Sequence, residues 1–120
     1  MNTWSRAGVD LTVQFPATWV VEEEPGWINL FPTPRKKEFV MIRLPRTVEG
    51  ARADAARECA LRIGKAGSVT GDSTRASAHD RDRNGILWVV AKGKAVVEAW
   101  IMHPEEPGPE ARGIIESITL

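Results

Sequence analysis

The sequence predicts an α+β domain, an antiparallel β-sheet of about six to seven strands with one central helix and one C-terminal helix packed on it. Three observations carry this prediction. Strand-like apolar segments fill the first and last thirds of the chain, a helix-like segment lies between them, and glycine and proline turn signals separate consecutive strands. The length of 120 residues, with 42% hydrophobic and 27% charged residues, fits a single domain over 1–120.

The first third of the chain predicts four strands. The clearest is 9–15, because its apolar and polar residues alternate strictly, which is the period of a strand with one buried face. Pro16 ends this strand, since proline lacks the backbone donor that a ladder needs. Three shorter apolar segments bounded by proline or glycine turns follow it: 19–21, 27–31 and 39–44.

The segment 50–66 predicts the central helix, because it is rich in Ala and Arg and almost free of β-branched residues. At helical spacing its small apolar residues form one stripe, made of Ala55, Ala56, Cys59, Ile63 and Ala66. We expect Gly67 to cap its C-terminus. Acidic and basic residues are spaced to pair along its surface, namely Asp54 and Glu58 with Arg57 and Arg62.

The last third predicts a three-stranded meander followed by a helix. A polar strand at 74–82 leads into Asn84–Gly85, a dipeptide typical of two-residue hairpin turns. The apolar segments 86–91 and 95–102 then flank a second short turn centred on Gly93. After an acidic, proline-rich linker, Pro109 starts a helix whose apolar residues have amphipathic spacing: Ala111, Ile114, Ile115 and Ile118.

Composition excludes several classes of protein. Sixteen basic residues balance sixteen acidic ones and the pI is about 6.7, which argues against a dedicated nucleic-acid or membrane-surface binder. A single cysteine and two histidines predict no disulfide framework, no metal site and no cofactor. The chain shows no signal peptide and no long apolar span, so we expect a cytoplasmic protein, the alternative being a mature or trimmed form.

The order of elements resembles the PsbP-like superfamily, which includes bacterial DcrB-like proteins. The residues that carry the resemblance are the opening strand running into Phe15-Pro16-Ala17-Thr18-Trp19, the further strands, the central helix, the meander and the closing segment ARGIIESITL, residues 111–120. The resemblance implies an antiparallel sheet between helices, an α/β/α sandwich used mainly as a non-enzymatic binding scaffold. It also implies a bacterial adaptor or chaperone for an effector of a secretion system, or an immunity protein against a toxin.

Five tryptophans and no tyrosine point to a candidate binding surface. The meander strands are apolar on both sides, and a sheet apolar on both sides needs cover on both sides. The chain predicts one narrow central helix and one short terminal helix, so one face is expected to remain incompletely covered and open to another protein. We place Leu87, Val89, Val97 and Ile101 on the opposite face, and the binding residues are Trp27, Trp88, Trp100 and Met102. The alternative is that the terminal helix and loops close that face.

Two alternative hypotheses for the functional site remain. The basic loop Arg35, Lys36 and Lys37 would bind an acidic partner, with affinity that falls steeply as salt rises. A small-ligand-binding or catalytic domain is the other alternative, with His79 or His103 as general base and Ser77 near His79. No nucleophile elbow or other catalytic motif accompanies these residues, so we expect no enzyme.

Overall fold

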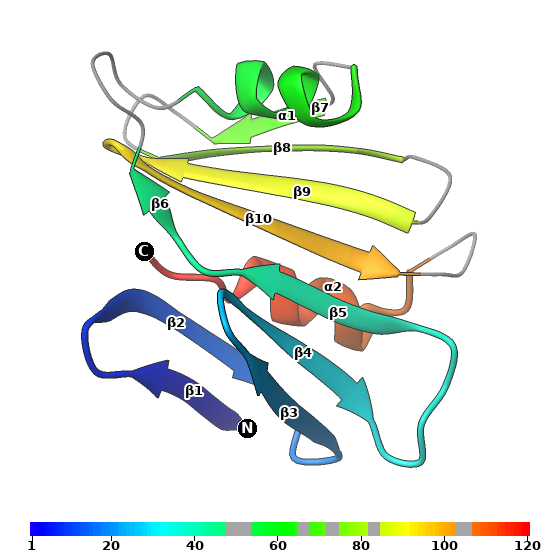
Figure 1. The fold of residues 1–120 in the computed structure, drawn as a ribbon. Coiled ribbons are helices and arrows are strands. Elements are labelled where there is room, and N and C mark those ends of the chain that lie inside the picture. Colours follow the sequence, from blue (N-terminus) through cyan, green and yellow to red (C-terminus); the bar gives the residue numbers. More distant parts are fainter. Residues whose placement is uncertain (48–53, 65–67, 72–74, 82–84, 103–106) are drawn as a thin grey trace.

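The computed structural model describes residues 1–47, 54–64, 68–71, 75–81, 85–102 and 107–120. Its elements in chain order are β1 (Asn2–Arg6), β2 (Val9–Phe15), β3 (Trp19–Glu24), β4 (Trp27–Pro32), β5 (Phe39–Arg43), β6 (Arg46–Thr47), α1 (Ala55–Ile63), β7 (Ser68–Gly71), β8 (Arg75–Arg81), β9 (Gly85–Lys92), β10 (Ala95–Met102) and α2 (Pro109–Glu116). They form an antiparallel sheet with two helices, so the predicted α+β class is confirmed (Figure 1).

The main sheet has the strand order β3-β4-β5-β10-β9-β8-β7, and β6 pairs with β10 beside that path. All of these pairs are antiparallel. The order places β5 next to β10, which joins the first-third strands to the meander through the register Trp100↔Met41. The strands β3, β4 and β5 thereby share one continuous sheet with the meander strands β8, β9 and β10.

The two faces of the sheet have different covers. On one face, called here the α2 face, α2 and the separate β1–β2 hairpin close the main core. On the other, called the α1 face, α1 packs over β7, β8 and β9 with Ala55 and Cys59 against Leu87 and Val89 (Figure 1). Helices therefore lie on both sides of the sheet, as predicted.

The predicted assignment of meander residues to faces was wrong. In the register of β9 and β10, Trp88 lies opposite Ala99, and Leu87 lies opposite Trp100. Neighbours across an antiparallel ladder point to the same face. Trp88 consequently shares the α2 face with Val97 and Ile101, whereas Leu87 and Val89 share the α1 face with Trp100. The sequence pattern alone left this register open, because both faces of both strands are apolar.

The strand β1 was not predicted, since its residues are mostly polar. It pairs with β2, and its one buried side chain, Trp4, enters the main core. The C-terminal segment joins the same hairpin, because Thr12 and Thr119 exchange two backbone hydrogen bonds of 2.9 Å. The residues after α2 therefore extend the layer that covers the main core on the α2 face.

The central helix is shorter than predicted in the described residues. Asp54 caps its N-terminus by accepting a hydrogen bond from the backbone N–H of Arg57, at 3.2 Å. Gly64, with φ of +77°, caps its C-terminus, so the predicted cap at Gly67 was wrong, and Gly67 itself lies outside the described residues. The expected intrahelical pairing of Glu58 was also wrong, because its carboxylate contacts Arg46 of β6.

The other predicted elements are confirmed where they are described. Turns at Gly26 and Gly93 adopt positive φ, and α2 buries Ala111, Ile114 and Ile115 as its spacing predicted. Ile118 is also buried but follows the end of the helix. The predicted turn residue Asn84 lies outside the described residues, whereas Gly85 begins β9 and pairs with Met102.

Candidate binding site on the α1 face

The helix α1 covers only part of its face. It packs on β7, β8 and β9, and Val96 and Trp100 of β10 join its cluster, whereas β5, β4 and β3 carry no described helix on this side. The side chains that β4, β5 and β10 direct to this side are largely apolar and only partly buried. We call this set the apolar floor: Trp27, Phe31, Phe39, Met41, Trp100 and Met102.

Ring contacts organise one end of the apolar floor. Phe31 and Phe39 stack with their ring centroids 5.1 Å apart. The guanidinium of Arg35 lies 4.0 Å from the centre of the Phe31 ring, and Arg35 also forms an ion pair with Glu22 of β3. Arg35 of the predicted basic loop therefore borders the apolar floor, while Lys36 and Lys37 are exposed to solvent.

Three of the four predicted sheet-face residues lie together. Trp27, Trp100 and Met102 belong to the apolar floor, and Trp27 is 37% exposed. Trp88 is the exception, because it lies on the α2 face and stacks on His79 at 4.6 Å between ring centroids. Phe39 and Met41 were missed as site residues, although they lie two positions apart in a strand segment and so share one face.

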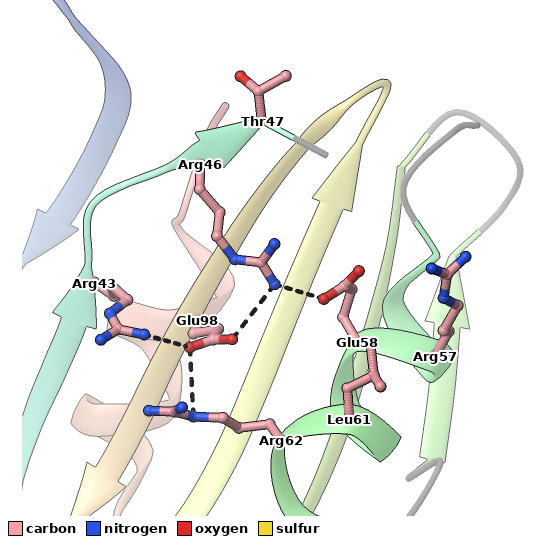
Figure 2. Close-up of a pocket in the computed structure, with 8 residues that line it drawn as sticks. All are labelled: Arg43, Arg46, Thr47, Arg57, Glu58, Leu61, Arg62 and Glu98. Carbon is pink, nitrogen blue, oxygen red and sulfur yellow. Dashed lines mark hydrogen bonds and ion pairs between the residues drawn. The ribbon is translucent and has the colours of Figure 1, made fainter. Parts of the chain in front are cut away.

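A pocket of about 500 Å³ lies between α1, β6 and β10 (Figure 2). Arginines and two carboxylates dominate its walls, and we call it the arginine pocket. Its lining residues are Arg43, Arg46, Thr47, Arg57, Glu58, Leu61, Arg62 and Glu98. A smaller hollow lined by Trp27, Met41 and Trp100 shares Arg43, Arg62 and Glu98 with it. The pocket and the apolar floor are therefore continuous.

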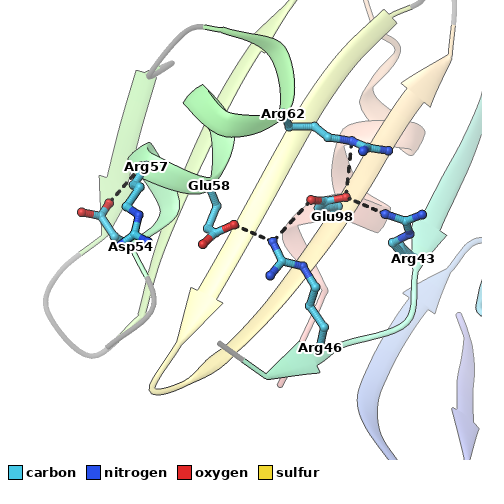
Figure 3. A network of polar contacts seen from close by, with 7 residues as sticks. All are labelled: Arg43, Arg46, Asp54, Arg57, Glu58, Arg62 and Glu98. Carbon is cyan, nitrogen blue, oxygen red and sulfur yellow. Dashed lines mark hydrogen bonds and ion pairs between the residues drawn. The ribbon is translucent and has the colours of Figure 1, made fainter. Parts of the chain in front are cut away.

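Glu98 is the centre of the pocket. It lies in the middle of β10 and is 5% exposed, and burying a carboxylate is costly unless cations accompany it. Three arginines from three elements surround it: Arg43 at 3.5 Å, Arg62 at 3.6 Å and Arg46 at 3.7 Å (Figure 3). Arg46 also contacts Glu58, itself 5% exposed, at 2.5 Å. The buried carboxylates of Glu58 and Glu98 thus form ion pairs with arginines whose side chains are partly exposed.

Local sequence explains how the arginines converge. Arg43 is the last residue of β5, and Pro45 interrupts the strand. Arg46 then begins β6, which pairs with the N-terminal end of β10. Arg62 lies in the last turn of α1, where a cation is favourable beside the helix C-terminus. The sequence analysis missed this site. Its signal was the single acidic residue, Glu98, within the otherwise apolar strand 95–102.

Of the alternative catalytic residues, Ser77 and His79 lie in the described part of the chain, both on β8. His79 stacks on Trp88, and its Nδ1 is buried without a hydrogen-bond partner there. His103 lies outside the described residues. Burial raises the pKa of the Cys59 thiol, with the Asp80 charge acting in the same direction, so this thiol is a poor nucleophile.

Nowhere in the described residues do three His, Cys, Asp or Glu side chains come together as a metal-binding group. The helices found there are too short or too polar to cross a membrane.

Comparison with known proteins identifies the fold. The chain matches no protein-family model, and no curated protein matches it. A crystal structure of a protein from Bacteroides thetaiotaomicron VPI-5482 is similar to it, with a TM-score of 0.65 and 16% sequence identity. The similarity covers 91% of this chain and 44% of that chain, so this chain spans less than half of that protein's length. At this identity the likeness concerns the fold alone.

Proposed function

We propose that this domain is a non-enzymatic protein-binding module that holds its partner against the apolar floor of the α1 face. The observation that carries the proposal is the incomplete cover that the described residues give this face. Among the described residues, the large hydrophobic side chains exposed to solvent are Met1, Val20, Trp27 and Leu61. Apart from Met1, all of them lie on the α1 side of the molecule, on β3, β4 and α1.

The chemistry of the apolar floor suits protein recognition. Tryptophan and methionine are enriched at protein interfaces, where they contribute large contact areas and adapt to the shape of the partner. Arginines at the edge of the apolar floor add hydrogen-bond donors, and interfaces typically surround an apolar centre with a polar rim. Within this class, the resemblance to PsbP-like proteins favours an adaptor or chaperone for a secreted effector, or an immunity protein for a toxin.

Affinity capture with matched variants tests the proposal. Tagged wild-type protein, Trp27→Asp and Arg112→Asp are used as baits in the source cells, after circular dichroism has shown that all three are folded. Trp27 is on the apolar floor, whereas Arg112 is exposed on α2 on the opposite face. We expect the wild type and Arg112→Asp to retain the same stoichiometric partner and Trp27→Asp to lose it, because a buried unpaired charge opposes docking.

Two results would overturn the proposal. Equal capture of the partner by Trp27→Asp and the wild type would move binding away from the apolar floor. Capture of no stoichiometric protein by the wild type would shift the function to a small ligand or to catalysis.

A further inference from the structure

We infer that the arginine pocket receives carboxylate side chains of the partner, so that the partner presents an acidic segment with apolar residues beside it. This inference rests on the proposed function and adds the chemistry of the partner. The first argument is charge. Four arginines and two glutamates line the pocket, which leaves a formal excess of two positive charges.

The distribution of these charges matters as much as their number. The side chains of Glu58 and Glu98 are each 6% exposed, whereas those of Arg43, Arg46 and Arg62 are 44–48% exposed. The carboxylates thus lie at the bottom of the pocket, and the arginine side chains above them are open to solvent. A partner that approaches the pocket meets the positive groups first, so the pocket attracts anions.

The guanidinium groups keep donors for a further ligand. A guanidinium carries five N–H groups, and a carboxylate pairs with two of them at once. The contacts of the three arginines with Glu98 are 3.5–3.7 Å, longer than the usual hydrogen-bond distance. Glu98 therefore positions these arginines without saturating them, and an incoming carboxylate meets donors that are already oriented.

The surroundings of the pocket favour a short acidic peptide segment over a long polyanion. The pocket opens onto Trp27, Met41 and Trp100 on one side and has the 70% exposed Leu61 on its wall, so apolar residues next to the acid find contacts. Glu24 of β3 lies exposed on the same sheet, opposite Trp27, whereas the charge of Glu22 is paired with Arg35. The charge of Glu24 would repel a nucleic-acid backbone that extended across the face.

NMR titration of the purified domain tests this chemistry directly. The probes are hexaglutamate, hexaglutamine of the same length, inorganic phosphate and an oligothymidylate, each added at low salt, and the signals are the Nε–Hε resonances of the arginines. We expect hexaglutamate to shift Arg43, Arg46 and Arg62 but not Arg112, and hexaglutamine to leave all four unchanged. The shifts should diminish as salt is added.

Charge-reversal variants complete the test. Arg57→Glu alters the pocket wall at an exposed helix position, and Arg112→Glu makes the same change on the other face. We expect Arg57→Glu to weaken hexaglutamate binding about tenfold and Arg112→Glu to leave it unchanged. Three results would each overturn the inference. The first is that millimolar hexaglutamate shifts no arginine signal, and the second is that phosphate or oligothymidylate binds more strongly than hexaglutamate. The third is that the two variants have equal effects on binding.

The inference and the proposed function fail in different ways. If Trp27→Asp abolishes capture of the partner while Arg57→Glu leaves capture unchanged, the apolar floor binds a protein and the acidic contact is wrong. If Trp27→Asp changes nothing, the proposed function itself is wrong.

Discussion

Arg46 Nη2 lies 2.5 Å from Oε2 of Glu58, and this contact joins the two-residue strand β6 to the helix α1. The carboxylate of Glu58 is buried, whereas the Arg46 side chain is 44% exposed. The helix therefore buries one acidic residue on the side that faces the sheet, and a cation from another element compensates it. This pairing joins α1 to β6 at the arginine pocket (Figure 2).

Removal of this cation should destabilise the fold. Arg46→Gln leaves a buried carboxylate without its ion pair, which costs more than the pair itself contributes. We expect a loss of about 1–2 kcal/mol in the free energy of unfolding, less than for a fully buried pair because Arg46 is partly solvated. Urea denaturation measures it, with Arg35→Gln as control, since its partner Glu22 is exposed. Equal losses in the two variants would contradict this account of Glu58.

Substitution by alanine should have opposite effects on stability at Gly85 and at Gly113. A Cβ on Gly85 would overlap the backbone carbonyl of Ile101 on the neighbouring strand, so Gly85→Ala must force β9 and β10 apart. Gly113 lies within α2 with no atom within 4 Å of the added Cβ, and alanine favours helix. We expect Gly85→Ala to destabilise by about 2–4 kcal/mol and Gly113→Ala to stabilise by about 0.5–1 kcal/mol. Thermal unfolding of both variants provides the measurement, and the same sign of shift in both would be inconsistent with the register.

The thiol of Cys59 reports on the docking of α1. Its pKa is raised by burial and by the Asp80 charge, so little reactive thiolate forms at neutral pH. We expect slow reaction with Ellman's reagent in the native protein and rapid reaction in urea. The control is the double variant Cys59→Ala with Leu61→Cys, because position 61 is 70% exposed on the same helix. Comparable native rates for the two thiols would show that α1 does not bury Cys59.

The ion pair between Arg6 and Glu23 predicts a pH dependence. Its hydrogen bond, from Arg6 Nε to Glu23 at 3.0 Å, holds the pKa of the carboxyl below its ordinary value of 4.5. A lowered pKa stabilises the folded protein above the ordinary value, and this contribution is lost as the pH falls through the folded pKa. We expect Arg6→Gln to raise the pKa of Glu23 in an NMR titration. The stability difference between the two proteins should be present at neutral pH and vanish in acid. An unchanged Glu23 titration would contradict the pairing.

The strands and helices were largely predictable because their signals are local. Alternation defined β2, proline and glycine defined the turns, and the spacing of isoleucines defined α2. The hairpin partner β1 was not predictable in this way, because five mostly polar residues carry no period. Its stability derives from pairing with β2 and from the burial of Trp4.

The candidate site was predictable only in part. A sheet apolar on both faces indicated an open surface, and Trp27, Trp100 and Met102 do lie on it. Trp88 was assigned to the wrong face because the register between β9 and β10 decides its side, and no local pattern fixes that register. The arginine pocket depends on β6 pairing with β10 near α1, a contact between distant segments. Only Glu98, a charge within an apolar strand, marked it in the sequence.

The central claim is that a partner protein contacts the apolar floor, and site-specific photo-cross-linking in the source cells tests it most directly. The photoreactive residue p-benzoylphenylalanine replaces Trp27 on the apolar floor, Leu61 beside the pocket, or Arg112 on the opposite face. We predict one common protein cross-linked from positions 27 and 61 and not from 112. Cross-links from 112 alone, or none from 27 and 61, would contradict the claim.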